Sequence, residues 1–302
     1  MPPRRLEKIA AFWKERARFE LRAAWDILWE ARRAFTRDGC MNLAAAVAFY
    51  SILGAIPFLF LIVSATAYVL GSSDRAHVLA MDFLNQYFPE TSGVIFDQVR
   101  AVSRRAGLLG WVGILSMFWT ASVIFSSLDF ALAVVFRVEK RRGFLKGKLL
   151  ALAMVPGAGA LFLLSIFGTA FSGVIDAYGL SLLGINVAQS VFFEFLVSYL
   201  FPYLILAFAF TAIYRVVPNT RIAMRHALVG GMSGAFLFEV AKHFFTWYVS
   251  RSPTYNIIYG SLEALVILVL WAFYSSTILL FCAEVVSAYR RRDVTLLEKA
   301  FL

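Results

Sequence analysis

The stretch that decides the fold is SLEALVILVLWAFYSSTILLFCAEVVSAY, residues 261–289. It contains no Lys or Arg, and its two acidic residues lie toward its ends. A helix rises about 1.5 Å per residue, so roughly 20 apolar residues cross the 30 Å of hydrocarbon in a bilayer. The stretch therefore predicts a transmembrane helix.

Five further stretches of the 302 residues are as apolar, and each is bounded by charged or turn residues. They are Leu43 to Leu70, Leu108 to Phe136, Leu149 to Phe171, Val187 to Tyr214 and Ala227 to Val249. The chain is 61% hydrophobic and 16% charged, with a mean hydropathy of +0.74, which is more apolar surface than one soluble core needs. We expect an all-α integral membrane protein with six transmembrane helices.

The positive charges orient this bundle, because basic loops beside helix ends stay on the cytoplasmic side. The first forty residues hold ten Lys and Arg, and residues 137–148 hold six. Basic residues also mark the fourth connection and the tail: Arg215, Arg221, Arg225, Arg290, Arg291, Arg292 and Lys299. The third connection, residues 172–186, has none, and only Arg104 and Arg105 break the alternation. Both termini are predicted to be cytoplasmic.

The chain divides into a basic segment 1–40, a transmembrane domain 41–290 with an external amphipathic loop 71–106, and a tail 291–302. In the basic segment, apolar residues recur at spacings of three or four: Leu6, Ile9, Trp13, Ala17, Leu21, Trp25 and Leu28. This pattern predicts an amphipathic helix on the inner leaflet or, alternatively, one packed on another cytoplasmic element. Cys40 and Cys282 lie near the cytoplasmic face, so we expect reduced, structural thiols.

Three prolines predict weak points in the spans, since each removes a backbone donor at membrane depth. They are Pro57, Pro156 and Pro202. The run Pro57-Phe58-Leu59-Phe60-Leu61 also matches Pro202-Tyr203-Leu204-Ile205-Leu206 without a gap. Since three helices separate the copies, the match fits an inverted repeat of the kind found in transporters, or chance matching among aliphatic residues.

Ionisable side chains inside a bilayer are the first functional candidates, because their burial is costly. Glu239 lies near the middle of the fifth span, with Lys242 and His243 three and four residues further on, on one helical face. The three could form part of a polar pathway, or the pair could simply neutralise itself. Asp129 and Glu194, in the second and fourth spans, are further candidates.

Two other acidic residues are weaker candidates. Glu263 and Glu284 lie within about two turns of the ends of the sixth span, where water or a snorkelling Arg can reach them. They carry less weight as intramembrane sites than Glu239.

Motifs for an enzyme are absent from the sequence. It contains no serine nucleophile elbow, no phosphate-binding glycine loop and no His and carboxylate cluster that could hold a metal. We expect no catalytic site, no metal and no cofactor. The net charge of +10 lies at loop ends, so the expected partners are membrane lipids with anionic headgroups rather than nucleic acid. The sequence leaves homo-oligomerisation open.

The chain resembles the YihY/BrkB family of bacterial inner-membrane proteins, formerly labelled ribonuclease BN. The resemblance rests on AAAVAFYSILGAIPFLFL from Ala44, GILSMFWTASVIFSSLDFAL from Gly113, YRVVPNTRIAMRHALVGG from Tyr214 and TYNIIYGSLEALVILVLW from Thr254. It implies a six-helix, multi-pass inner-membrane fold and, as a family-level expectation, transport of a lipid-like or small polar molecule. The ribonuclease label finds no support in the residues.

The matched block includes a short segment on the outer side, before the sixth span. Tyr255, Asn256, Tyr259 and Gly260 predict either a rigid re-entry turn or a substrate gate. We expect a transporter or lipid-handling protein of the cell envelope. The alternative is a scaffold or envelope-integrity factor whose charges lock helix packing, and a membrane-associated ribonuclease is disfavoured.

Overall fold

The computed structural model describes most of the long apolar stretches. The residues described are 22–71, 106–139, 142–143, 145–154, 157, 160–161, 164, 181–182, 185–186, 199–251 and 263–301.

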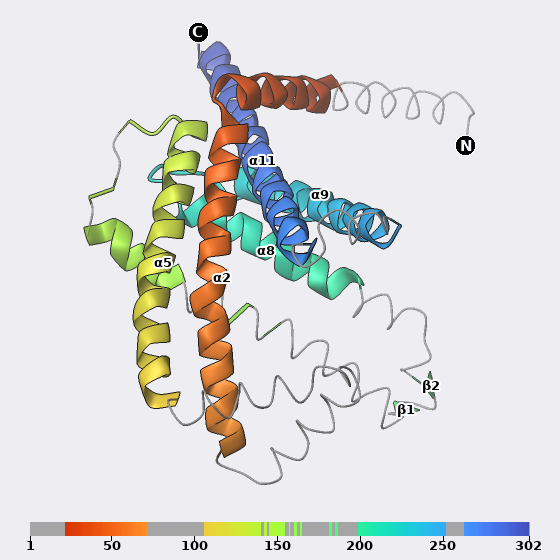
Figure 1. Cartoon of the computed structure of the whole chain (residues 1–302). Helices are drawn as coiled ribbons and strands as arrows, with labels where there is room; N and C mark the ends of the chain where they lie inside the picture. Colours follow the sequence, from red (N-terminus) through yellow and green to blue (C-terminus); the bar gives the residue numbers. More distant parts are fainter. Residues whose placement is uncertain are drawn as a thin grey trace. The chain divides into compact units, whose positions relative to one another are not determined.

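Long helices occupy the described parts of the predicted spans (Figure 1). They are α2 (Cys40–Gly71), α5 (Ala106–Val135), α8 (Phe201–Val216), α9 (Met224–Ser250) and α11 (Glu263–Phe301). Residues 22–37 and 145–154 are also helical. α11 continues without a break beyond residue 289, so the predicted tail is helical as far as Phe301.

A small strand pair adds to the helical fold. β1 (Ser181–Leu182) pairs antiparallel with β2 (Ile185–Asn186), with Ser181 opposite Asn186. From the sequence, residues 172–186 were expected only to connect two spans. Two-residue strands carry too little periodicity to be recognised in a sequence.

Two segments of the described chain are long and apolar enough to cross a membrane, namely Phe118–Val135 in α5 and Leu265–Thr295 in α11. Cys40–Gly54 and Phe201–Val216 are apolar but shorter. The described residues therefore support spanning helices at two of the six predicted positions. The six-span topology and its orientation stay predictions.

The chain forms two compact units. One comprises residues 49–127, and in it Gly54 of α2 faces Ile124 and Thr120 of α5. The other comprises residues 1–48 and 128–302. The candidate site lies in this second unit.

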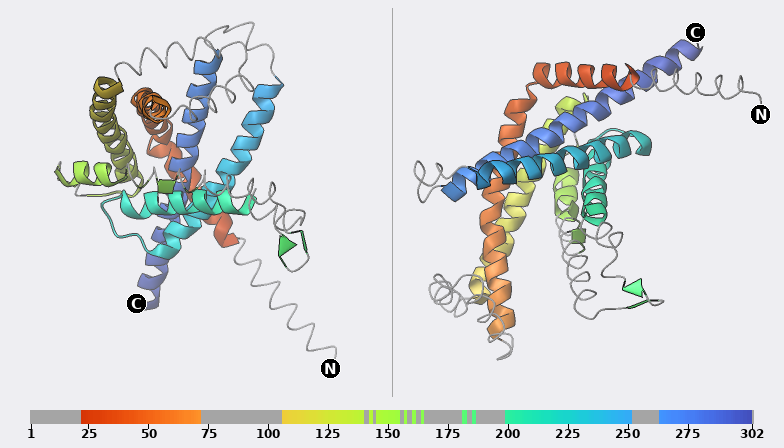
Figure 2. Two further views of the ribbon diagram at one scale, coloured as in Figure 1. Left: turned by 90° about the horizontal axis from the view of Figure 1, so that it is seen from below. Right: turned by 90° about the vertical axis from the view of Figure 1, so that its right-hand side faces the viewer.

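The core of the second unit is the packing of α9 against α8 and α11 (Figure 2). Glycines on α9 permit its close approach to α8 and α11. A Cβ on Gly231 would lie 2.6 Å from the Ala207 carbonyl oxygen of α8, and one on Gly230 would meet Tyr214 and Val286. The fully buried Tyr214 donates its hydroxyl proton to the carbonyl oxygen of Leu279 at 2.9 Å. This bond joins α8 to α11.

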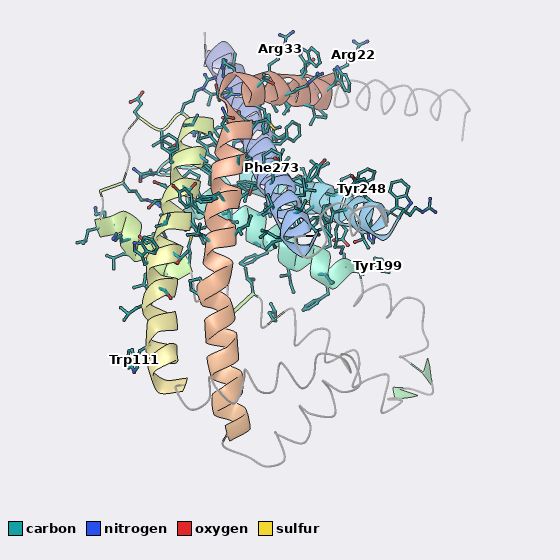
Figure 3. All side chains as sticks on the ribbon, viewed as in Figure 1. Arg22, Arg33, Trp111, Tyr199, Tyr248 and Phe273 are labelled. Carbon is teal, nitrogen blue, oxygen red and sulfur yellow. The ribbon has the colours of Figure 1, made fainter. Side chains whose placement is uncertain are left out.

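The helix over residues 22–37 packs against the C-terminal half of α11. Ala31 lies in a buried cluster with Val285 and Ala288, and Arg291 Nε donates to Glu30 Oε1 at 2.9 Å. On this face the helix packs on another helix, at residues of the predicted sixth span, and its cytoplasmic location stays a prediction. The opposite face exposes apolar and basic side chains: Trp25, Leu28, Trp29, Arg22 and Arg33 (the two arginines are labelled in Figure 3). That exposed face keeps the amphipathic character expected of a helix at a membrane surface.

Two polar contacts fix the ends of the core helices. Arg142 donates to the carbonyl oxygens of Val216 and Val217, at 2.9 and 3.0 Å, where α8 ends and its carbonyls lack helical partners. Asp293 of α11 binds His226 Nε2 and an Arg225 guanidinium nitrogen, each at 2.8 Å, at the start of α9. These contacts tie the connection between α8 and α9 to segments distant in the sequence.

Candidate functional site

Glu239, Lys242 and His243 lie together on α9, as their spacing requires. Lys242 Nζ donates to Glu239 Oε1, and His243 Nε2 lies 3.6 Å from the same oxygen. The exposed fractions of the side chains are 28% for Glu239, 45% for Lys242 and 66% for His243. The cluster is therefore a paired but accessible group of charges rather than a sealed one.

Large apolar side chains surround this cluster on the outer surface of α9. Phe236, Val240 and Phe244 are each more than half exposed, and Trp247 is half exposed. A soluble protein rarely exposes a continuous stripe of this kind, whereas a helix in contact with lipid does. The charged cluster thus lies beside a surface suited to hydrocarbon.

Lys242 also lines a hollow of about 520 Å³ between α9 and α11. The described residues of its wall are Lys242, Phe245, Thr246, Ile267, Leu268 and Trp271. Within this wall, the Trp271 ring contacts those of Phe245 and Phe238, at centroid distances of 5.0 and 5.2 Å, and Phe238 itself does not line the hollow. The Lys242 ammonium group therefore lies in the wall of a mostly apolar hollow. Such an arrangement could bind an amphipathic anion.

Of the other predicted residues of the polar pathway, Asp129 lies among the described residues and Glu194 does not. Asp129 lies half-buried on α5, engages an interaction partner, and is not among the described residues that line the hollow. Glu194 lies outside the described residues. The same is true of the predicted gate or turn, Tyr255, Asn256, Tyr259 and Gly260.

Two of the three predicted kink residues can be placed. Pro57 is buried inside α2, which continues through it to Gly71. Pro202 lies in the first turn of α8, directly after π-helical residues 199–200. The backbone N–H groups of a first turn have no acceptor within the helix, so a proline there removes no helical hydrogen bond. Pro156 lies outside the described residues. Kinks at these prolines and the inverted repeat stay predictions.

Glu284 corrects an expectation from the sequence. Its side chain was expected to reach water or a snorkelling Arg, but it is fully buried within an unbroken buried run, residues 282–288. Its Oε1 accepts a hydrogen bond from Cys40 Sγ at 3.7 Å. The signal was present in the sequence, since small and apolar residues flank Glu284 on all sides of the helix, as in a helix buried all round.

A second hollow, of about 620 Å³, lies at the connection between α8 and α9. The described residues that line it are Arg142, Arg215, Pro218, Asn219, Thr220, Arg221 and Ile222. None of these residues carries a carboxylate. Three guanidinium groups around one concave surface favour an anionic group such as a phosphate. The sequence indicated basic loops here but not their convergence.

Comparisons with known proteins identify relatives of this chain. The family model described as Virulence factor BrkB matches residues 31–300. The chain is 31% identical over 269 residues to a UPF0761 membrane protein of Alkalilimnicola ehrlichii, covering 89% of this chain and 59% of that protein. It is 31% identical over 274 residues to one of Azotobacter vinelandii, covering 88% and 64%.

Other relatives differ in length. A UPF0761 membrane protein of Aliivibrio salmonicida is 26% identical over 286 residues, covering 95% of this chain and 90% of that protein. The chain thus spans about three fifths of the longer relatives named above and nearly all of this one. No solved structure matches the chain. Since the family model covers most of its length, the chain belongs to the Virulence factor BrkB family, together with proteins named as membrane proteins.

Proposed function

We propose that this membrane protein of the BrkB family transports or otherwise handles lipids in the inner membrane of a bacterial cell, without enzymatic chemistry. The observation that carries the proposal is the hollow between α9 and α11, where Lys242 meets walls of Phe245, Leu268 and Trp271. An amphipathic anion suits both parts of this surface. Its charged headgroup would bind the ammonium, and its hydrocarbon would contact the apolar walls.

The arginine-lined hollow supports the same proposal from the predicted cytoplasmic side. Arg142, Arg215 and Arg221 would bind phosphate-bearing headgroups of the inner leaflet, which attract basic residues close to the surface. Nucleic acid would also present phosphates, but the exposed apolar stripe of α9 favours a lipid surface.

The competing proposal, a scaffold locked by buried charges, fits the cluster on α9 less well. Glu239, Lys242 and His243 all lie on one helix, so their ion pair joins no two helices. The pairing of Asp293 with Arg225 and His226 is the kind of contact that a scaffold needs, because it joins α9 to α11. Both kinds of contact are therefore present. The Asp293 pairing joins two helices, whereas the cluster on α9 does not, so a role in binding suits the cluster better.

Lys242→Gln is expected to reduce lipid movement by about tenfold or more, because it removes a charge-assisted hydrogen bond of about 1.5 to 3 kcal/mol to the headgroup. The measurement is the transfer rate of a fluorescent anionic phospholipid between leaflets of vesicles that contain the purified protein. Glu239→Gln, which frees the ammonium from its intrahelical partner, should also change this rate.

Lys146→Gln is the matched control, since Lys146 is exposed on the helix over residues 145–154 and away from the hollow. It removes the same charge and should leave the rate unchanged. Equal rates for the Lys242→Gln variant and the unmodified protein would refute the role of the hollow. RNA cleavage by purified protein with divalent metal would refute the non-enzymatic part of the proposal.

A further inference from the structure

Glu284 leaves half of its carboxyl group without a partner. The side chain is 0% exposed, and its Oε1 accepts a hydrogen bond from the thiol of Cys40 at the start of α2. Its Oε2 is buried and has no hydrogen-bond partner among the described residues. An unpaired acceptor at such a position is costly, so it indicates either a missing proton donor or a proton on the atom itself.

Asp38 presents a second unpaired oxygen at the same place. It lies at the corner where the helix over residues 22–37 turns into α2, and Gly39 adopts a φ of +65° to make that turn. Asp38 Oδ1 accepts from Arg37 Nε at 2.9 Å, while Oδ2 is buried and unpaired among the described residues. Two carboxyl groups from segments far apart in the sequence thus each have one buried oxygen without a partner among the described residues.

The two carboxyl groups interact with each other. Burial alone would raise the pKa of Asp38, but the hydrogen bond from Arg37 and the charges of Arg37 and Arg137 lower it below its usual value. Asp38 is therefore the ionised member of the pair. A second full negative charge on Glu284 beside it would meet direct repulsion at a buried site.

The nearby cations bind other groups and form no ion pair with Glu284 among the described residues, although Arg291 Nη2 is buried and has no hydrogen-bond partner there. Arg37 pairs with Asp38, and Arg291 donates to Glu30 Oε1 at 2.9 Å and to Ser287 Oγ at 2.8 Å. Glu284 takes part in no ion pair within the described part of the chain. A buried carboxyl without a counter-ion favours its neutral, protonated form.

We propose that Asp38 and Glu284 form a proton-binding site. The bound proton is carried by Glu284 Oε2, which donates a hydrogen bond to Asp38 Oδ2. Binding converts the Glu284 carboxylate to a carboxylic acid, and both unpaired oxygens acquire a partner. The groups that face the bound proton are Asp38 and Arg37 from the corner, Cys40 from α2, Arg137 from the end of α5, and Arg291 from α11. The site joins the corner at Gly39 to α11.

Infrared spectroscopy of this chain in a detergent without ester groups tests the proposal directly. A protonated carboxylic acid has a carbonyl-stretching band that no carboxylate or amide shares. We expect such a band at neutral pH, and its complete loss in Glu284→Gln. Glu239→Gln is the control, because Glu239 is already paired with Lys242, and the band should persist.

Two conservative variants keep the test decisive if Glu284→Gln fails to fold. Asp38→Asn replaces a charged acceptor with a weaker neutral one, and Cys40→Ser replaces a weak donor with a stronger one, so each should shift the band without removing it. The absence of a protonated-acid band, or a band insensitive to all three variants, would overturn the proposal. Loss of the band on adding sodium at constant pH would also overturn it, because the pair would then hold a metal cation.

Discussion

Gly231→Ala is expected to lower the free energy of unfolding by about 1 to 3 kcal/mol, the usual cost of overpacking a close contact. The added Cβ would lie 2.6 Å from the Ala207 carbonyl oxygen and 3.0 Å from the Thr211 backbone nitrogen, and closer still to Thr211 Oγ1. Backbone atoms cannot move aside as a flexible side chain can, so α8 and α9 must separate. Chemical unfolding in detergent, followed by tryptophan fluorescence, measures the change.

Gly147→Ala provides the matched control for this prediction. Gly147 also lies in a helix, but a Cβ there meets nothing within 4 Å. Its replacement should leave stability unchanged or raise it by up to about 1 kcal/mol, because alanine favours helix more than glycine does. Equal effects of the two substitutions would show that the α8–α9 contact is looser than the structure indicates.

Tyr214→Ala is expected to cost still more, about 3 to 5 kcal/mol, because it empties a fully buried aromatic site. The ring packs against Phe210, at a centroid distance of 6.0 Å, and its hydroxyl binds the carbonyl of Leu279. Tyr214→Phe keeps the ring and loses only the hydrogen bond, so it should cost about 1 kcal/mol.

The same unfolding measurement distinguishes the two contributions. If Tyr214→Phe proves as costly as Tyr214→Ala, the hydrogen bond rather than the ring holds α8 against α11. If neither variant changes stability, the three-helix core does not depend on Tyr214, and the prediction is wrong.

Sequence reasoning succeeded where the information is local. Hydropathy runs predict α2, α5, α9 and α11, because a long apolar stretch has few structures other than a helix in lipid. The contact of Glu239 with Lys242 and His243 follows from helical spacing alone. The role of these residues in a polar pathway stays a prediction.

Sequence reasoning failed where contacts join distant segments. Glu284 appeared accessible because it lies near the end of an apolar stretch, yet α11 continues to Phe301 and Cys40 of α2 contacts the Glu284 carboxyl group. The hollow at Lys242 takes half of its wall from α11, and the arginine-lined hollow needs Arg142 from another segment. No periodicity in one segment reveals which other segment will pack on it.

The burial of both cysteines has a practical consequence for establishing the membrane topology. Cys40 and Cys282 are the two cysteines of the chain, and each is 0% exposed. Thiol-directed reagents need a solvent-accessible thiolate, so the unmodified protein should stay unlabelled in intact vesicles. Single cysteines introduced into each predicted loop can then be tested with a membrane-impermeant maleimide without first removing the native thiols. The side of the bilayer on which each loop lies would follow from its labelling.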